Sequence, residues 1–120
     1  DALQKFSYVS AMAACGLYYG AEAAAMQKQG EIRDTFIALI KEIDALAVAM
    51  GIYFTIDIVQ INLDILDKLA PTASTSMQRD IAQGKKSELD GLIFEVVRMG
   101  EKYGVPVKTY KKITEKYPVK

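Results

Sequence analysis

Apolar residues recur every three or four positions along most of this chain, which is the spacing of one face of an α-helix. The pattern is clearest from Ile32 to Met50, where charged residues fill the other faces and Gly51 follows at the position that commonly ends a helix. Strand-like alternation is limited to a few residues around Ile56. The sequence therefore predicts an all-α fold.

Glycine, proline and serine residues divide the helical pattern into six segments. The first, residues 1–27, is apolar on every side and should lie in the middle of the others. Gly16 and Gly20 should loosen or bend it. The other expected helices span residues 32–50, 55–69, 75–83, 87–104 and 107–117. We predict one all-α domain of about six helices over residues 1–120.

Composition excludes several classes of function. Histidine is absent, which removes Ser-His-Asp and Cys-His catalysis and nearly every common zinc site. Fifteen basic residues balance fifteen acidic ones, which argues against a nucleic-acid binder. The uncharged stretch from Phe6 to Ala21 is shorter than the about 20 residues that a membrane span needs. We therefore expect no metal, no nucleic acid and no membrane among its partners.

Two further features bear on the setting of the protein. Cys15 is the only cysteine and cannot form an internal disulfide, which suggests a reducing, cytoplasmic environment. The sequence has no Gly-x-Gly-x-x-Gly turn, so the chain should not hold a dinucleotide by itself. It begins at Asp1 inside a helical pattern, which suggests a piece of a longer protein.

Three polar residues are candidates for chemistry, and each has a purely structural alternative. Lys5 could face a cleft and donate a proton, or extend its amine into water from a helix end. Ser76 could bind a substrate carboxylate beside a helix N-terminus, or only cap that helix. Glu88 could orient a substrate or a lysine, or only complement the helix dipole. When each of these residues is considered alone, the structural interpretation is the favoured one.

The last twenty residues are rich in lysine. Lys108, Lys111, Lys112 and Lys116 are predicted to form a solvated face of the final helix. A phosphate site on that face is the alternative interpretation.

Several short motifs follow one another along the chain. Residues 74–81 have the sequence Ser-Thr-Ser-Met-Gln-Arg-Asp-Ile, and Gly84-Lys85 and Ser87-Glu88-Leu89-Asp90 follow. Flanking them are Lys5-Phe6, Glu42, Ala49-Met50-Gly51-Ile52 and Tyr103-Gly104-Val105-Pro106. This ordered set resembles the C-terminal domain of the ketopantoate reductase (2-dehydropantoate 2-reductase) family, whose fold is 6-phosphogluconate dehydrogenase C-terminal-like.

The resemblance implies an NADPH-dependent oxidoreductase that reduces 2-dehydropantoate, a small 2-oxo acid, to (R)-pantoate in pantothenate biosynthesis. It also implies a homodimer with an N-terminal Rossmann domain that binds NADPH and is absent from this chain, so residues 1–120 alone should be inactive. By position, Lys5 matches the general acid and Glu88 the carboxylate that orients lysine and substrate. Ser76 matches the hydroxyl that binds the substrate carboxylate.

Some positions depart from the family pattern. Many members have asparagines one and two turns after the catalytic lysine, where this chain has Val9 and Ala13. Val107 stands where Thr-Pro is common after the Gly-x-Pro turn. Two alternatives therefore stay open: a reductase of another 2-oxo acid or ketone, and a non-catalytic helical dimerisation module.

Overall fold

The computed structural model describes residues 2–20, 22–54, 56–71 and 93–116. Within these ranges it contains helices and no strands. They are α1 (Ala2–Tyr19), α2 (Ala23–Gln27), α3 (Glu31–Ala49), α4 (Ile58–Asp67), α6 (Glu95–Tyr103) and α7 (Lys108–Lys116). The all-α prediction is confirmed.

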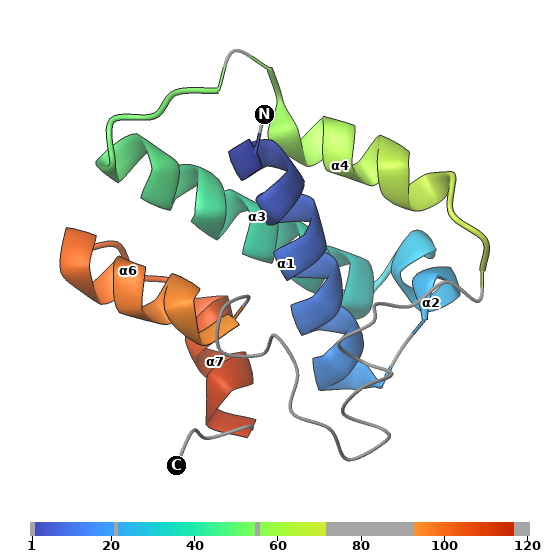
Figure 1. The fold of residues 1–120 in the computed structure, drawn as a ribbon. Helices are drawn as coiled ribbons and strands as arrows, with labels where there is room; N and C mark the ends of the chain where they lie inside the picture. The colour runs from blue at the N-terminus through green and yellow to red at the C-terminus, as the bar shows by residue number, and fades with distance from the viewer. Residues whose placement is uncertain (1, 21, 55, 72–92, 117–120) are drawn as a thin grey trace.

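Helices α1 and α3 form the centre of the molecule (Figure 1). Helix α3 packs against α1, α2, α4, α6 and α7, while α1 packs mainly against α3 and α7. The start of α1 lies beside the start of α4. Residues 10–17 of α1 are buried on every side, as the apolar pattern predicted for a helix surrounded by others.

The predicted first helix is interrupted after Tyr19. Gly20 adopts a φ of 62°, a left-handed conformation that ends α1, and the chain turns helical again only at Ala23. Gly16, in contrast, is buried inside α1 and does not interrupt it. Of the two glycines expected to loosen this segment, only Gly20 does so.

The predicted end of α3 is confirmed in detail. Gly51 has a φ of 84° and donates its N–H to the carbonyl oxygen of Val48 at 3.0 Å. The N–H of Ile52 donates to the carbonyl oxygen of Ala47 at 2.8 Å. This pair of bonds is the Schellman motif, which requires a positive φ at the glycine.

The remaining helices agree with the sequence to different extents. The helix expected over residues 55–69 is α4, which is shorter at both ends. The helix predicted to end near Gly104 does so, with Gly104 at a φ of 72°. The final helix, α7, begins at Lys108, one residue later than predicted, and its described part extends to Lys116. The expected helix 75–83 lies outside the described residues, so the six described helices are not the six predicted ones.

The core is built from the inner faces of these helices. Its largest fully buried side chains include Tyr110, Phe36, Met26, Leu39 and Ile40. Each such side chain stabilises the fold by about 1.5–3 kcal/mol relative to leaving it exposed. No helix in the described ranges is both long enough and apolar enough to cross a membrane.

Candidate functional site

The structure places Lys5 in the first turns of α1, with an exposed side chain. An exposed lysine is compatible with both alternatives stated for this residue, so its role stays a prediction. Ser76 and Glu88 lie outside the described residues. The predicted meeting of the three side chains therefore stays a prediction.

The row of α1 that follows Lys5 is apolar. Val9, one turn further on, is half-buried, and Ala13 is fully buried. The hydroxyl of Tyr8 donates to the sulfur of Met12 at 3.1 Å, and burial raises the pKa of this tyrosine. At the two positions where many family members have asparagines, this domain therefore offers no polar side chain to a ligand.

A buried polar cluster joins α1 to α4 close to Lys5, and sequence reasoning missed it. Asn62 Nδ2 donates to Ser7 Oγ at 3.0 Å, and the Ser7 hydroxyl donates to the carbonyl oxygen of Gln4 at 2.6 Å. Both Ser7 and Asn62 are fully buried. A signal was present, because Asn62 follows Ile58 by four residues and precedes Leu66 by four, on the buried face of α4.

A second network joins α1, α3 and α7. Ser10 Oγ and the hydroxyl of Tyr110 lie 2.8 Å apart and share a buried hydrogen bond. The Glu42 carboxylate, from α3, accepts from the backbone N–H of Thr109 at 2.9 Å and of Tyr110 at 3.1 Å. Burial raises the pKa of the Tyr110 phenol, which keeps it neutral. Glu42, which was part of the family resemblance without a stated role, is thus a structural residue here.

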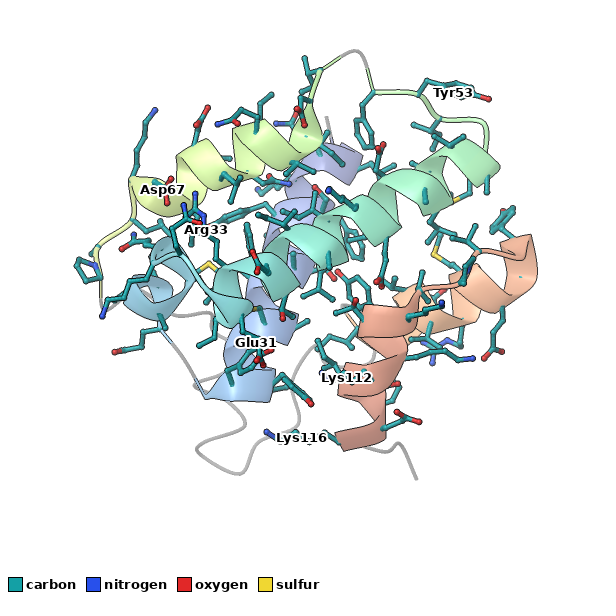
Figure 2. The ribbon with its side chains drawn as sticks, turned by 180° about the vertical axis from the view of Figure 1, so that it is seen from behind. Glu31, Arg33, Tyr53, Asp67, Lys112 and Lys116 are labelled. Atoms are coloured by element: carbon teal, nitrogen blue, oxygen red, sulfur yellow. The ribbon has the colours of Figure 1, made fainter. Side chains whose placement is uncertain are left out.

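The end of α4 is anchored by side chains from α2 and α3. Arg33 forms a bidentate ion pair with Asp67, at 2.9 and 3.1 Å, and the two lie side by side in Figure 2. Gln27 Nε2 donates to the carbonyl oxygens of Leu66 and Leu69 at 2.9 and 3.0 Å. These contacts fix the point from which the chain continues toward Ser76.

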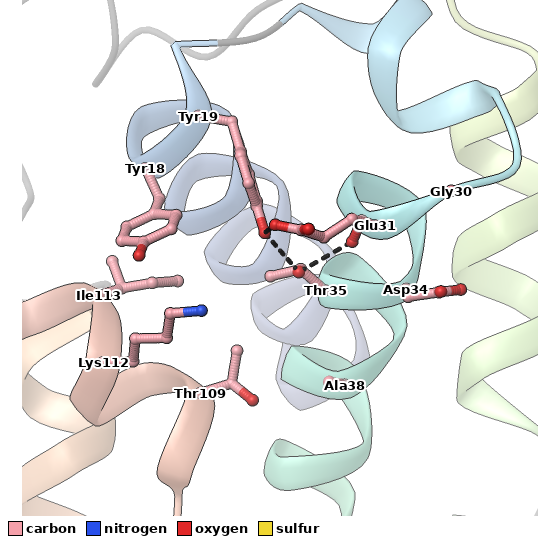
Figure 3. Close-up of a pocket in the computed structure, with 10 residues that line it drawn as sticks. All are labelled: Tyr18, Tyr19, Gly30, Glu31, Asp34, Thr35, Ala38, Thr109, Lys112 and Ile113. Atoms are coloured by element: carbon pink, nitrogen blue, oxygen red, sulfur yellow. Dashed lines mark hydrogen bonds between the residues drawn. The ribbon is translucent and has the colours of Figure 1, made fainter.

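A pocket of about 410 Å³ opens between the end of α1, the start of α3 and α7 (Figure 3). Its polar groups largely bind one another: the Tyr19 hydroxyl lies 2.9 Å from Glu31 Oε2 and 2.9 Å from Thr35 Oγ1. Lys112 Nζ lies 5.5 Å from the ring centre of Tyr18, a cation–π distance. Lys5 is about 20 Å away along α1, at 1.5 Å per residue, so this pocket is not the predicted site.

The four lysines of α7 are exposed, which confirms the predicted solvated face. Lys116 also contacts α1, since its Nζ donates to the carbonyl oxygen of Tyr18. Figure 2 shows Lys112 and Lys116 on the same side of α7, toward the end of α1.

The other chemical groups give no further site in the described part of the chain. Cys15 is buried, its Sγ donates to the carbonyl oxygen of Ile32 at 3.3 Å, and burial raises the pKa of the thiol to about 12. It therefore stays protonated near neutral pH and is a poor nucleophile. Among the described residues, no group of three or more potential metal ligands comes together.

The sequence of this chain matches the model of a known protein family. Residues 1–117 match the family described as "Ketopantoate reductase PanE/ApbA C terminal". The chain belongs to this family. No curated protein matches it.

Solved structures of ketopantoate reductases share the fold. The PanE/ApbA family ketopantoate reductase of Ralstonia eutropha JMP134 is 24% identical with a TM-score of 0.81, and the match covers 94% of this chain and 38% of that one. The 2-dehydropantoate 2-reductase of Methylococcus capsulatus is 23% identical with a TM-score of 0.85, over 96% and 36% of the two chains. D-mandelate dehydrogenase in complex with NADH and anilino(oxo)acetate is 18% identical with a TM-score of 0.79, over 94% and 38%. The chain thus spans well under half the length of these proteins.

Proposed function

We propose that this domain is the substrate-binding part of an NADPH-dependent reductase that converts 2-dehydropantoate to pantoate in pantothenate biosynthesis. The observation that carries the proposal is the family match over residues 1–117. The ordered motifs around Lys5, Ser76 and Glu88 support it at the level of single residues. The remainder of the enzyme would be an N-terminal Rossmann domain.

The residues of this chain do not fit NADPH on their own, because the sequence has no glycine-rich phosphate loop. The nucleotide would be held mainly by the other domain. This chain would bind the oxo acid, hold it in place and supply a proton. The position of Lys5 supports that role, because its exposed amine can face a second domain.

The proposed roles follow from the chemistry of a 2-oxo acid. Reduction of the keto group to an alcohol requires a proton at the oxygen that becomes the hydroxyl, and the ammonium group of Lys5 would donate it. Ser76 would donate a hydrogen bond to the substrate carboxylate. Glu88 would accept hydrogen bonds from Lys5 and from a substrate hydroxyl, and so would orient both.

A different 2-oxo acid is the second candidate substrate. Val9 and Ala13 stand where many members have asparagines on the row that follows Lys5. Ala13 is fully buried, so it is the half-buried Val9 that would favour a substrate with an apolar side chain. The likeness of the fold to D-mandelate dehydrogenase, described with anilino(oxo)acetate, is compatible with an aromatic substituent. A non-catalytic module is the third possibility and is an outcome of the same experiment.

The experiment uses the full-length protein, NADPH and NADH, and a panel of 2-oxo acids that includes ketopantoate and phenylglyoxylate. We expect NADPH oxidation with ketopantoate and a loss of at least about 100-fold in kcat for Lys5→Ala. Lys41→Ala, which removes an exposed lysine of α3, is the matched control and should retain the rate. A preference for another acid would select the second candidate, and no turnover with any acid would favour the non-catalytic module.

We also propose that the enzyme is a cytoplasmic homodimer. A ketopantoate reductase of Staphylococcus aureus is described as dimeric and shares the fold, at 18% identity and a TM-score of 0.85 over 94% of this chain and 39% of that one. Around the loop after α3, this domain exposes Val48, Ile52, Tyr53 and Ile56, by 44%, 38%, 72% and 43%. Tyr53 extends away from the body of the molecule in Figure 2. Sedimentation of the full-length protein should give twice the mass of one chain, and a monomer would contradict the proposal.

A further inference from the structure

The turn of α1 that carries Lys5 is connected to α4 by hydrogen bonds. Gln4, Lys5 and Ser7 belong to the same helical turn, and the Ser7 hydroxyl donates to the carbonyl oxygen of Gln4 at 2.6 Å. Asn62 of α4 donates to that hydroxyl at 3.0 Å. Two consecutive hydrogen bonds, both inside the domain, therefore connect the backbone beside Lys5 to the middle of α4.

This turn needs such support for a physical reason. Lys5 is exposed, so packing does little to hold its own side chain, and the placement of its amine depends on how firmly the backbone of this turn is held. Phe6 packs against the core and limits rotation of the helix, but an apolar contact is less directional than a hydrogen bond.

Asn62 is present at this position at a cost in stability. It is fully buried between Ile58 and Leu66, and its Oδ1 has no hydrogen-bond partner in the part of the chain that the structure describes. A leucine has as many side-chain heavy atoms as asparagine and would leave no acceptor unpaired. The hydrogen bond to Ser7 is what the amide supplies and a leucine would not.

We propose that Asn62, acting through Ser7, positions Lys5 for proton transfer. This inference rests on the proposed function, in which Lys5 is the proton donor. Neither Asn62 nor Ser7 touches the substrate, since both are sealed inside the domain. They are positioning residues, and removing them should affect the chemical step rather than the binding of substrate.

The test compares variants of the full-length enzyme by steady-state kinetics with the preferred oxo acid. Asn62→Leu should lower kcat about tenfold and change the KM for the oxo acid and for NADPH less than twofold. Ser7→Ala should do the same, and the double variant should be no slower than either single one, because both remove the same connection. Wild-type kcat in both single variants would overturn the proposal.

Leu66→Ala is the matched control. It removes a fully buried side chain from the same face of α4 and leaves the bond between Asn62 and Ser7 in place. It should lower the melting temperature but keep kcat at temperatures well below unfolding. Asn62→Leu should melt no lower than Leu66→Ala, because it removes an unpaired buried acceptor and opens no cavity. An equal loss of kcat in Leu66→Ala would show that any loss of stability in α4 lowers the rate, and it would contradict the proposal.

A failure of the proposed function gives a different result. If the wild type reduces no oxo acid, or Lys5→Ala keeps the full rate, then Lys5 is not the proton donor. That result would not show whether Asn62 and Ser7 hold this turn of α1. Hydrogen exchange of the amides of residues 6–9 then decides whether the connection exists. Faster exchange in Asn62→Leu than in Leu66→Ala would support a local hold on this turn, and unchanged exchange would exclude it.

Discussion

The N-termini of α4 and α7 are stabilised in the same way by groups of different origin. At α4, Asp57 precedes the helix and its carboxylate accepts from the N–H groups of Val59 and Gln60 at 3.1 and 3.2 Å. At α7, the equivalent N–H groups, of Thr109 and Tyr110, are bound by Glu42 from α3. A local side chain caps one helix, and a carboxylate 67 residues away in the sequence caps the other.

The residue that precedes α7 explains the difference. Val107 occupies the N-cap position, since its carbonyl oxygen accepts from the N–H of Lys111 at 2.9 Å. Its side chain has no acceptor and is buried, so it packs instead of capping. Glu42 replaces the missing acceptor and, in doing so, fixes α7 to α3. A distant cap therefore adds a tertiary contact that a local cap does not.

Glu42→Ala should have the largest effect on stability. It leaves two backbone N–H groups at the start of α7 unpaired and removes charge-assisted bonds between two helices, at a cost of roughly 2 kcal/mol in the free energy of unfolding. Urea denaturation of the full chain measures this. Glu42→Gln, which keeps one acceptor oxygen, should lose about half as much, and equal stability of all three proteins would show that the distant cap contributes nothing.

Asp57→Ala should cost less, about 1 kcal/mol, because it removes a local cap and no contact between helices. The same denaturation experiment measures it. Asp57→Ser, which keeps an acceptor at the N-cap, is the control and should lie within a few tenths of a kcal/mol of the wild type. A larger loss in Asp57→Ala than in Glu42→Ala would reverse the comparison.

Val107→Thr should partly rescue the Glu42→Ala variant. Threonine has nearly the shape of valine and brings a hydroxyl to the N-cap position of α7, which should restore about 0.5–1 kcal/mol. In the presence of Glu42 the same substitution should gain little, because the N–H groups are already bound. A double-mutant cycle on the free energy of unfolding measures the coupling, and additive effects would contradict the account of α7.

The ion pair that anchors the end of α4 should give the smallest effect. Arg33 holds the pKa of Asp67 below its ordinary value of 3.8, so the pair stabilises the fold above that pH and the contribution is lost as pH falls through the lowered pKa. Because the Asp67 side chain is 47% exposed, Asp67→Asn should cost no more than about 1 kcal/mol at pH 7. The difference between wild type and variant should shrink below pH 4, and a constant difference from pH 7 to pH 3 would exclude this cause.

Of the two caps, the sequence could predict the local one at α4 but not the distant one at α7. Asp57 directly precedes an apolar helical pattern, so its capping role could have been found by local rules, although our expected helix began at residue 55. Nothing near α7 indicates Glu42, because that contact depends on how α3 packs. Gly51 was predictable from local pattern, whereas only the fold distinguishes Gly20, which ends a helix, from Gly16, which does not.

The candidate site also has parts that the sequence could predict and parts that it could not. The position of Lys5 at the start of an apolar helix followed from the sequence, and so did the family, because its motifs occur in order. The Ser7–Asn62 pair did not, since it joins residues 55 positions apart. Ser76 and Glu88 lie outside the described residues, and their roles rest on the family pattern alone.

A crystal structure of the full-length protein with its oxo acid bound tests the central proposal most directly. We predict that Lys5 Nζ lies within hydrogen-bond distance of the keto oxygen, that Ser76 Oγ contacts the substrate carboxylate, and that a Glu88 oxygen contacts Lys5 or the substrate. An oxo acid bound elsewhere, with these three side chains on separate surfaces, would contradict the proposed reductase site.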